Sequence, residues 1–150
     1  MAATTTLTPD ARIFLMGRPG IGRAHTGKLA TVRADGRPHV TPIWFDLDEP
    51  TGDLVFTCSH PTVKSKNMLR DPRVCLCIDD ETPPYAFIQI EGTVTISEDL
   101  GDLFYWAMRI GGRYMGEELA EAYGKRNGVP GELLIRVTPQ RIIFEDNIAG

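Results

Sequence analysis

The sequence predicts a mainly β protein with minor α content, folded as a small six-stranded antiparallel β-barrel with short flanking helices. Segments in which apolar and polar residues alternate are separated by tight-turn signals, of which Asp35-Gly36 is the strongest. Strands and helices also do not alternate as they would in a parallel sheet. A chain of 150 residues can bury one core, so residues 1–150 are taken as a single domain.

A short helix is expected at the start of the chain. Thr8-Pro9-Asp10 supplies an N-cap, a first-turn proline and an acidic residue before the segment ARIFLMG. The glycine-rich segment 17–23 follows this helix and lacks the lysine and Ser/Thr of a phosphate-binding loop. It is therefore interpreted as a connector.

Six segments have the composition and period of strands, at residues 27–34, 37–47, 54–59, 73–80, 85–97 and 132–146. Gly92 is expected to mark a bend in the fifth strand, and Pro139 a bulge or an edge position in the sixth. Between these strands, Ser97 is a suitable N-cap for a helix with apolar residues at helical spacing. GGRYMG is expected to interrupt that helix before a second short helix over 117–124.

The helix between the third and fourth strands has an unusual charge pattern. It begins at a cap formed by Thr62 or Ser59 and ends at Asp71-Pro72, with Lys64 and Lys66 in its first turn. A cation there opposes the helix dipole by about 0.3–1 kcal/mol. A bound anion would offset this cost, because free N–H groups, the dipole and two lysines together form a phosphate site. The alternative is a pair of solvated lysines on an exposed face.

Composition and charge argue against several classes of protein function. A net charge of −4 argues against non-specific nucleic-acid binding. No apolar run approaches the roughly 20 residues that span a bilayer, and the N-terminal residues do not form a signal peptide, so we expect a cytoplasmic protein without a membrane partner. Cys58, Cys75 and Cys77 fit neither a disulfide framework nor a zinc site, so we expect reduced thiols and no metal.

The chemistry is predicted to reside in a bound cofactor. No serine-nucleophile motif or paired-carboxylate cleft is present, and no side chain is assigned a catalytic role. A phosphate is expected at the helix start near Thr57, with a flat ring along residues 41–44, where Pro42 favours irregular pairing and leaves backbone groups available. A barrel of this size cannot enclose a large cofactor, so the groove is expected to be completed by a second chain.

The segments LATVRADGRPHVTPIWFDLD, GDLVFTCSHPTVKSKNMLRDPRVCLCIDD and PPYAFIQIEGTVTI resemble the FMN-binding split-barrel superfamily, the pyridoxamine 5'-phosphate oxidase-like group. The most similar branch is the actinobacterial one that uses the deazaflavin coenzyme F420. The resemblance extends over about residues 8–145. It implies a split β-barrel homodimer with two cofactor sites at the subunit interface. The cofactor contacts it implies are Thr41, Pro42, Ile43, Trp44, Phe56, Thr57, Ser59, Lys64, Lys66 and Asn67.

One departure from the superfamily bears on the cofactor. Members that bind FMN as pyridoxamine-phosphate oxidases have an Arg-Lys pair where this chain has Val63-Lys64. The lost arginine is a fixed fork suited to a terminal phosphate dianion, whereas a single lysine suits the phosphodiester of a deazaflavin coenzyme. The arginine and histidine set that holds substrate phosphate in such oxidases is also not found near the C-terminus, which disfavours vitamin B6 oxidation.

The expected function is therefore a coenzyme F420-dependent oxidoreductase that transfers hydride to a conjugated small molecule. Two alternatives stay open: a protein of the same fold that binds FMN or handles haem, and a non-catalytic coenzyme carrier. The anionic tail of the coenzyme gives a use to several basic residues, namely Lys28, Arg33, Arg37, Arg109 and Arg113.

Overall fold

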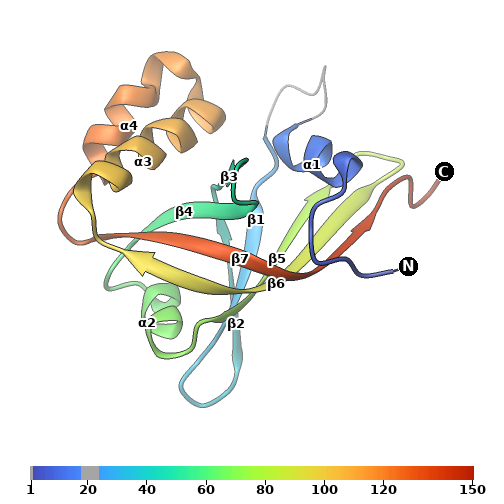
Figure 1. Ribbon diagram of the computed structural model, residues 1–150, viewed down its shortest axis with the longest axis horizontal. Coiled ribbons are helices and arrows are strands. Elements are labelled where there is room, and N and C mark those ends of the chain that lie inside the picture. The colour runs from blue at the N-terminus through green and yellow to red at the C-terminus, as the bar shows by residue number, and fades with distance from the viewer. Residues whose placement is uncertain (1, 18–23) are drawn as a thin grey trace.

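The computed structural model describes residues 2–17 and 24–150 (Figure 1). The predicted connector at 17–23 lies, apart from Gly17, outside the described residues. The elements in chain order are α1 (Pro9–Met16), β1 (Gly27–Val32), β2 (Pro38–Ile43), β3 (Asp46–Asp48), β4 (Asp53–Ser59), α2 (Val63–Arg70), β5 (Arg73–Asp80), β6 (Ala86–Ser97), α3 (Leu100–Met115), η1 (Glu117–Leu119), α4 (Ala120–Asn127) and β7 (Glu132–Glu145).

The described strands form one antiparallel sheet in the order β2-β1-β5-β6-β7-β4-β3. The antiparallel, mainly β class is confirmed, but the predicted number of six strands is wrong, because the sheet has seven. The predicted second strand ends at Ile43, and Asp46 begins a separate strand that pairs with β4 instead of β1. Ile43, Trp44 and Phe45 form a continuous apolar run between the two strands, so the sequence pattern did not reveal this change of partner.

The link between β2 and β3 brings the two edges of the sheet together. Ile43 pairs with Gly27 at one edge, while Asp46 pairs with Val55 at the other. Three Cα–Cα steps of about 3.8 Å separate them, so the edges approach within about 11 Å at this point. The sheet therefore curls into a barrel that is not closed by hydrogen bonds, and β2 keeps a free edge.

The bend predicted in the long strands is confirmed. The register between β6 and β7 shifts at Glu91/Gly92, opposite Pro139. A side chain at residue 92 would place its Cβ 2.4 Å from the Thr138 carbonyl oxygen, so only glycine allows this close approach.

The helix boundaries were partly predicted. Thr8 caps α1 as expected, through its Oγ1 and the Ala11 N–H. Helix α3, however, is capped by Asp99 rather than Ser97. The predicted interruption at GGRYMG is wrong, because α3 continues to Met115. Its glycines serve helix packing instead: a Cβ at Gly111 would lie 2.4 Å from the Tyr123 Cβ, so α4 approaches α3 too closely for any other residue.

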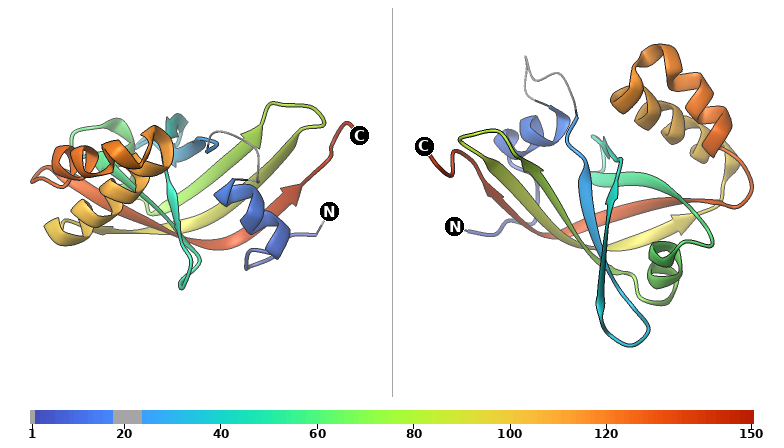
Figure 2. Two further views of the ribbon diagram at one scale, coloured as in Figure 1. Left: turned by 90° about the horizontal axis from the view of Figure 1, so that it is seen from above. Right: turned by 180° about the vertical axis from the view of Figure 1, so that it is seen from behind.

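Two clusters of buried side chains hold the fold together. The main core lies inside the curled sheet and includes Phe14 of α1. A smaller cluster joins α3 to β4 and β7, with Trp106 packed against Val55 and Leu134. Figure 2 shows the α3–α4 hairpin at the end of the sheet opposite the two chain termini.

Candidate functional site

The corner between β4 and α2 is fixed by a network of short polar side chains. Thr62 caps α2, accepting a hydrogen bond from the Ser65 N–H, and the helix ends at Asp71 as predicted. The Ser65 hydroxyl donates to the Ser59 carbonyl at 2.7 Å and lies 3.0 Å from the buried Cys58 sulfur. Burial raises the pKa of the Cys58 thiol, which stays protonated at neutral pH. The first turn of α2 is therefore held rigidly against the sheet.

A cavity of about 210 Å³ opens beside this corner, and we name it the Lys64 cavity. It lies where the end of β2, the middle of β4 and the first turn of α2 meet the α3–α4 hairpin. Its lining residues are Pro42, Ile43, Trp44, Thr57, Lys64, Ala107, Ile110, Gly111, Tyr123 and Asn127.

Lys64 dominates the electrostatics of this cavity. Of the described residues that line it, only Lys64 carries a charge, and no carboxylate is among them. The side chains of Thr57, Tyr123 and Asn127 add a hydroxyl, a phenol and an amide that can donate hydrogen bonds. A cation with neutral donors and no acid fits an anionic group such as a phosphate.

The wall opposite α2 is set by stacked aromatic rings. Trp44 stacks on Tyr114 with ring centroids 5.1 Å apart and planes at 9°, and Tyr123 lies 5.6 Å away. The Tyr114 hydroxyl donates to the His25 carbonyl at 2.8 Å and accepts from the Phe45 N–H at 3.3 Å. Burial raises the pKa of Tyr114, so it remains a phenol. These contacts hold the β2–β3 link in place.

Half of the predicted site residues meet in this cavity, namely Pro42, Ile43, Trp44, Thr57 and Lys64. Thr41, Phe56 and Ser59 are their neighbours along the same strands but do not line it. Phe56 is fully buried in the main core. The Ser59 hydroxyl donates to the Glu132 carboxylate at 2.7 Å.

Lys66 and Asn67 do not join Lys64. They line a separate groove of about 320 Å³ between α2 and the β1–β2 turn, where Arg33 also lies. Asn67 is buried, and its side chain donates to the Thr31 hydroxyl at 3.0 Å and accepts from Arg70 at 2.9 Å. Asn67 therefore connects α2 to β1, and Lys64 is the first-turn lysine that faces the cavity.

Sequence reasoning missed the contribution of the α3–α4 hairpin. Tyr123 and Asn127 cover the cavity, yet no motif in α4 marks them. The only available signal was the recurrence of glycines, because a Cβ at Gly111 or at Gly124 would come within 3.1 Å of a side chain of the other helix.

Most basic residues considered for a coenzyme tail have partners within the chain. Lys28 pairs with Asp79 at 2.6 Å, Arg37 with Asp35 at 2.7 Å and Arg109 with Asp46 at 3.2 Å. Arg113 donates to the Leu15 and Met16 carbonyls at the end of α1. Among the described residues, no helix is long and apolar enough to cross a membrane, and no group of His, Cys, Asp or Glu could hold a metal.

The sequence was also compared with models of known protein families. A family model described as pyridoxamine 5'-phosphate oxidase matches residues 18–146. The chain belongs to the pyridoxamine 5'-phosphate oxidase family. The resemblance stated from the motifs is thereby confirmed.

Two proteins to which this chain is similar are reductases. The chain is 28% identical over 133 residues to the 5a,11a-dehydrotetracycline/5a,11a-dehydrooxytetracycline reductase of Streptomyces rimosus, covering 80% of this chain and 86% of the relative. An F420 reductase of known structure is 31% identical, with a TM-score of 0.62 over 81% of this chain and 90% of that one. These relatives support an oxidoreductase.

The fold of this chain is similar to that of a further solved structure. A conserved hypothetical protein from Mycobacterium tuberculosis superposes with a TM-score of 0.76 at 24% identity, over 96% of this chain and 88% of that one. The split-barrel architecture is therefore shared along nearly the whole chain.

Proposed function

We propose that this protein is a coenzyme F420-dependent reductase that transfers hydride to a flat, conjugated small molecule. The observation that carries the proposal is the Lys64 cavity, where one unpaired cation and three neutral donors converge with no lining carboxylate among the described residues. The reductase of Streptomyces rimosus and the F420 reductase support the choice of reaction and coenzyme.

The residues present fit such a coenzyme. A cavity of about 210 Å³ can hold its phosphate end but not the whole molecule. The ring system would lie along the free edge of β2, whose backbone N–H and C=O groups can pair with ring heteroatoms. The bound coenzyme supplies the hydride, which is chemistry that no side chain here can provide.

Each side chain has a role in holding and orienting. Lys64 and the Thr57 hydroxyl bind the phosphate at the start of α2, where the helix dipole adds attraction. Asn127 and Tyr123 cover the same space and exclude water from it. No side chain is required as a proton donor, because the open edge of β2 leaves the proton to solvent.

FMN is the second candidate cofactor, favoured by the family match over residues 18–146 together with the resemblance to FMN-binding split barrels. Against FMN stands Val63, an exposed apolar residue beside Lys64 at the start of α2, in the place where pyridoxamine-phosphate oxidases that bind FMN have an arginine. The guanidinium that would bind a terminal phosphate dianion is therefore not supplied at this position.

We also propose that a second copy of the chain covers the outer face of the sheet beside β2. Val40, Ala30 and Cys75 are aligned across β2, β1 and β5 on the outer face of the sheet. Val40 is 66% exposed, and a hollow of about 550 Å³ lies beside it. This face continues to Pro42 at the Lys64 cavity, so a partner seated on it would complete the groove.

Sedimentation velocity tests the dimer. Val40→Asp is expected to convert a dimer to a monomer and to weaken coenzyme binding, because an uncompensated charge would be buried at the interface. Leu69→Asp is the matched control, since Leu69 is 50% exposed on α2. A dimer broken by Leu69→Asp and not by Val40→Asp would place the interface elsewhere.

Titration of the purified protein with F420 and with FMN, followed by fluorescence, tests the cofactor. Tighter binding of F420 by at least about tenfold is expected, whereas tighter FMN binding would contradict the proposal. Reduced coenzyme is then mixed with quinones and other conjugated acceptors, and its oxidation is followed by absorbance. Tight binding without any acceptor being reduced would identify a carrier.

A further inference from the structure

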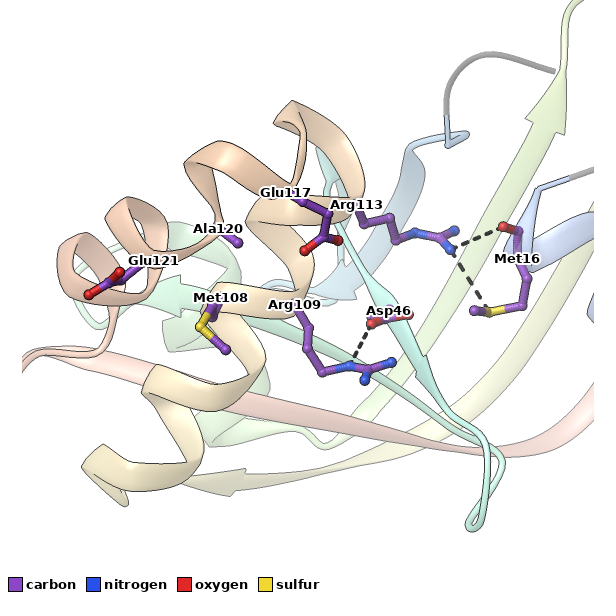
Figure 3. A pocket seen from close by; sticks show the side chains of 8 residues that line it. All are labelled: Met16, Asp46, Met108, Arg109, Arg113, Glu117, Ala120 and Glu121. Carbon is purple, nitrogen blue, oxygen red and sulfur yellow. Dashed lines mark hydrogen bonds and ion pairs between the residues drawn. The ribbon is translucent and has the colours of Figure 1, made fainter. Parts of the chain in front are cut away.

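A second and larger cavity lies beside the α3–α4 hairpin. We name it the Arg109 cavity; its volume is about 500 Å³. Its lining residues are Met16, Asp46, Met108, Arg109, Arg113, Glu117, Ala120 and Glu121 (Figure 3). It shares no lining residue with the Lys64 cavity, so the two can be considered separately.

Arg109 is held in a fixed orientation. Its Nε donates to Asp46 Oδ2 at 3.2 Å, and Asp46 is only 3% exposed, with its Oδ1 accepting from the Leu47 N–H at 2.8 Å. The guanidinium also lies over the rings of Tyr105 and Trp106, 5.7 Å and 5.4 Å from their centroids. These contacts engage the Nε side and the faces of the guanidinium.

A second arginine lies against the same ring and differs from Arg109 in having two carboxylates at one of its terminal nitrogens. Arg136 lies 5.5 Å from the Trp106 centroid and pairs with Asp48 at 2.7 Å and Asp53 at 3.7 Å. Arg109 has one carboxylate, on Nε. Among the described residues, its terminal nitrogens make only a 3.5 Å contact with the Tyr105 hydroxyl. The outer edge of Arg109 is therefore free to bind a carboxylate in the bidentate manner.

Of the other charged side chains that line the cavity, some have a partner within the described part of the chain and one does not. The terminal nitrogens of Arg113 donate to the carbonyls at the end of α1, and Glu121 pairs with Lys125 at 3.2 Å. Glu117 has no ion pair among the described residues, so its carboxylate can accept from an ammonium group. Met108 and Ala120 supply apolar surface on the same cavity (Figure 3).

We propose that the Arg109 cavity binds a small zwitterion with an apolar body, its carboxylate on Arg109 and its ammonium group on Glu117. A simple anion would meet the Glu117 carboxylate and a simple cation the Arg109 guanidinium, so the charge pattern favours a ligand that carries both charges. The rigid setting of Arg109 reduces the entropy lost on binding. This site does not depend on the proposed redox function.

Three probes with one ring test the charge requirement: L-phenylalanine, 3-phenylpropionate and 2-phenylethylamine. The chain contains two tryptophans, and their indole N–H signals in a ¹H–¹⁵N spectrum report separately on the two sites. Trp106 contacts Arg109, whereas Trp44 lines the Lys64 cavity. L-Phenylalanine is expected to shift the Trp106 signal and leave Trp44 unchanged, with the other two probes at least about fivefold weaker.

Variants then assign the two charges. Glu117→Gln is expected to weaken L-phenylalanine severalfold and to strengthen 3-phenylpropionate, because repulsion is removed. Glu118→Gln, at an exposed neighbour that does not line the cavity, should change neither. Arg109→Lys keeps the charge beside Asp46 but loses the fork, and it should weaken both carboxylate probes by about tenfold.

Several results would overturn the proposal. They are no binding of any probe at about 10 mM, equal binding of all three, or equal effects of Glu117→Gln and Glu118→Gln. Coenzyme binding at the Lys64 cavity is followed by the Trp44 indole signal and is independent of the Trp106 signal that reports on these three probes. A failure here therefore leaves the redox proposal standing, and the reverse also holds.

Discussion

The two cavities beside the α3–α4 hairpin differ in how their charges are balanced. In the Lys64 cavity a single cation meets neutral donors, with no carboxylate among the described lining residues. In the Arg109 cavity two arginines face three carboxylates, of which Asp46 is bound to Arg109 and Glu121 to Lys125, so the outer edge of Arg109 and the Glu117 carboxylate remain open. Charge left uncompensated by the fold indicates the charge of the ligand, so the first cavity suits an anion and the second a molecule without net charge.

The same contrast explains the lysines at the start of α2. A cation in the first turn of a helix is unfavourable by about 0.3–1 kcal/mol. For Lys64 the proposed anion offsets that cost, while Lys66 is exposed beside the groove on the other side of α2. The anion-site explanation therefore applies to Lys64, and the solvated-face explanation applies to Lys66.

The largest expected effect comes from loosening the α3–α4 hairpin, which lines both cavities. Trp106→Ala takes away the ring that packs the hairpin against Val55 and Leu134, and it should lower the free energy of unfolding by about 3–5 kcal/mol. Urea unfolding measures this loss, and both cavities should fail together. Tyr105→Ala is the control, because Tyr105 is 47% exposed and should cost less than about 1 kcal/mol. Equal costs for the two variants would mean that the small core does not anchor the hairpin.

The next effect concerns only the Lys64 cavity. Lys64→Ala is expected to weaken F420 binding by about 1.5–3 kcal/mol, the range for a hydrogen bond to a charged group, as measured by fluorescence titration. The free energy of unfolding should stay constant or rise by less than about 1 kcal/mol, since a first-turn cation is removed. Lys66→Ala is the matched control on the opposite side of α2 and should change affinity little. If both variants bind F420 as the wild type does, the lysines are merely solvated.

A smaller effect tests the wall of the Lys64 cavity. Tyr114→Phe keeps the ring stacked on Trp44 but removes the hydroxyl between His25 and Phe45. It should lower stability by about 1–2 kcal/mol, because a partly buried carbonyl and N–H lose their partner. Urea unfolding measures this, with Tyr105→Phe as control, whose hydroxyl makes only a 3.5 Å contact. An unchanged stability for Tyr114→Phe would show that the β2–β3 link is held by other contacts.

The smallest effect is a pH dependence at the seat of α2. Burial raises the pKa of the Cys58 thiol above 9.0, so the unfolded chain loses this proton first. The stability that Cys58 contributes is fully present below the unfolded pKa and is lost as the pH rises through the folded one. Between about pH 8 and pH 10 the free energy of unfolding should therefore fall through this group.

The control for that measurement is Cys58→Ala, which should flatten the alkaline part of the stability curve. Cys75 and Cys77 also have pKa values raised by burial and are less buried, so the variant keeps part of the slope. An identical curve for wild type and variant would show that Cys58 does not ionise in this range.

Much of the candidate site could be predicted from sequence because it depends on adjacent residues. Thr62 caps α2 and Asp71 ends it, as hydrogen bonding and the following proline require. Lys64 then follows from its place in the first turn. Lys66 and Asn67 lie in the same short helix and were predicted on the same grounds. Only the packing of α2 on β1 places them on the side of the helix away from the cavity.

The sequence by itself determined the antiparallel class, the hairpin at Asp35-Gly36, the bend at Gly92 and the lysine-bearing helix. The hairpin and the helix arise from steric limits and hydrogen bonds between residues close in the chain, and the glycine at residue 92 marks a position where a strand admits no side chain. Tertiary structure decided the rest: the break at Trp44, and the unbroken course of α3 through Gly111. Both depend on which distant surface a segment covers, and a local pattern of hydropathy cannot specify that surface.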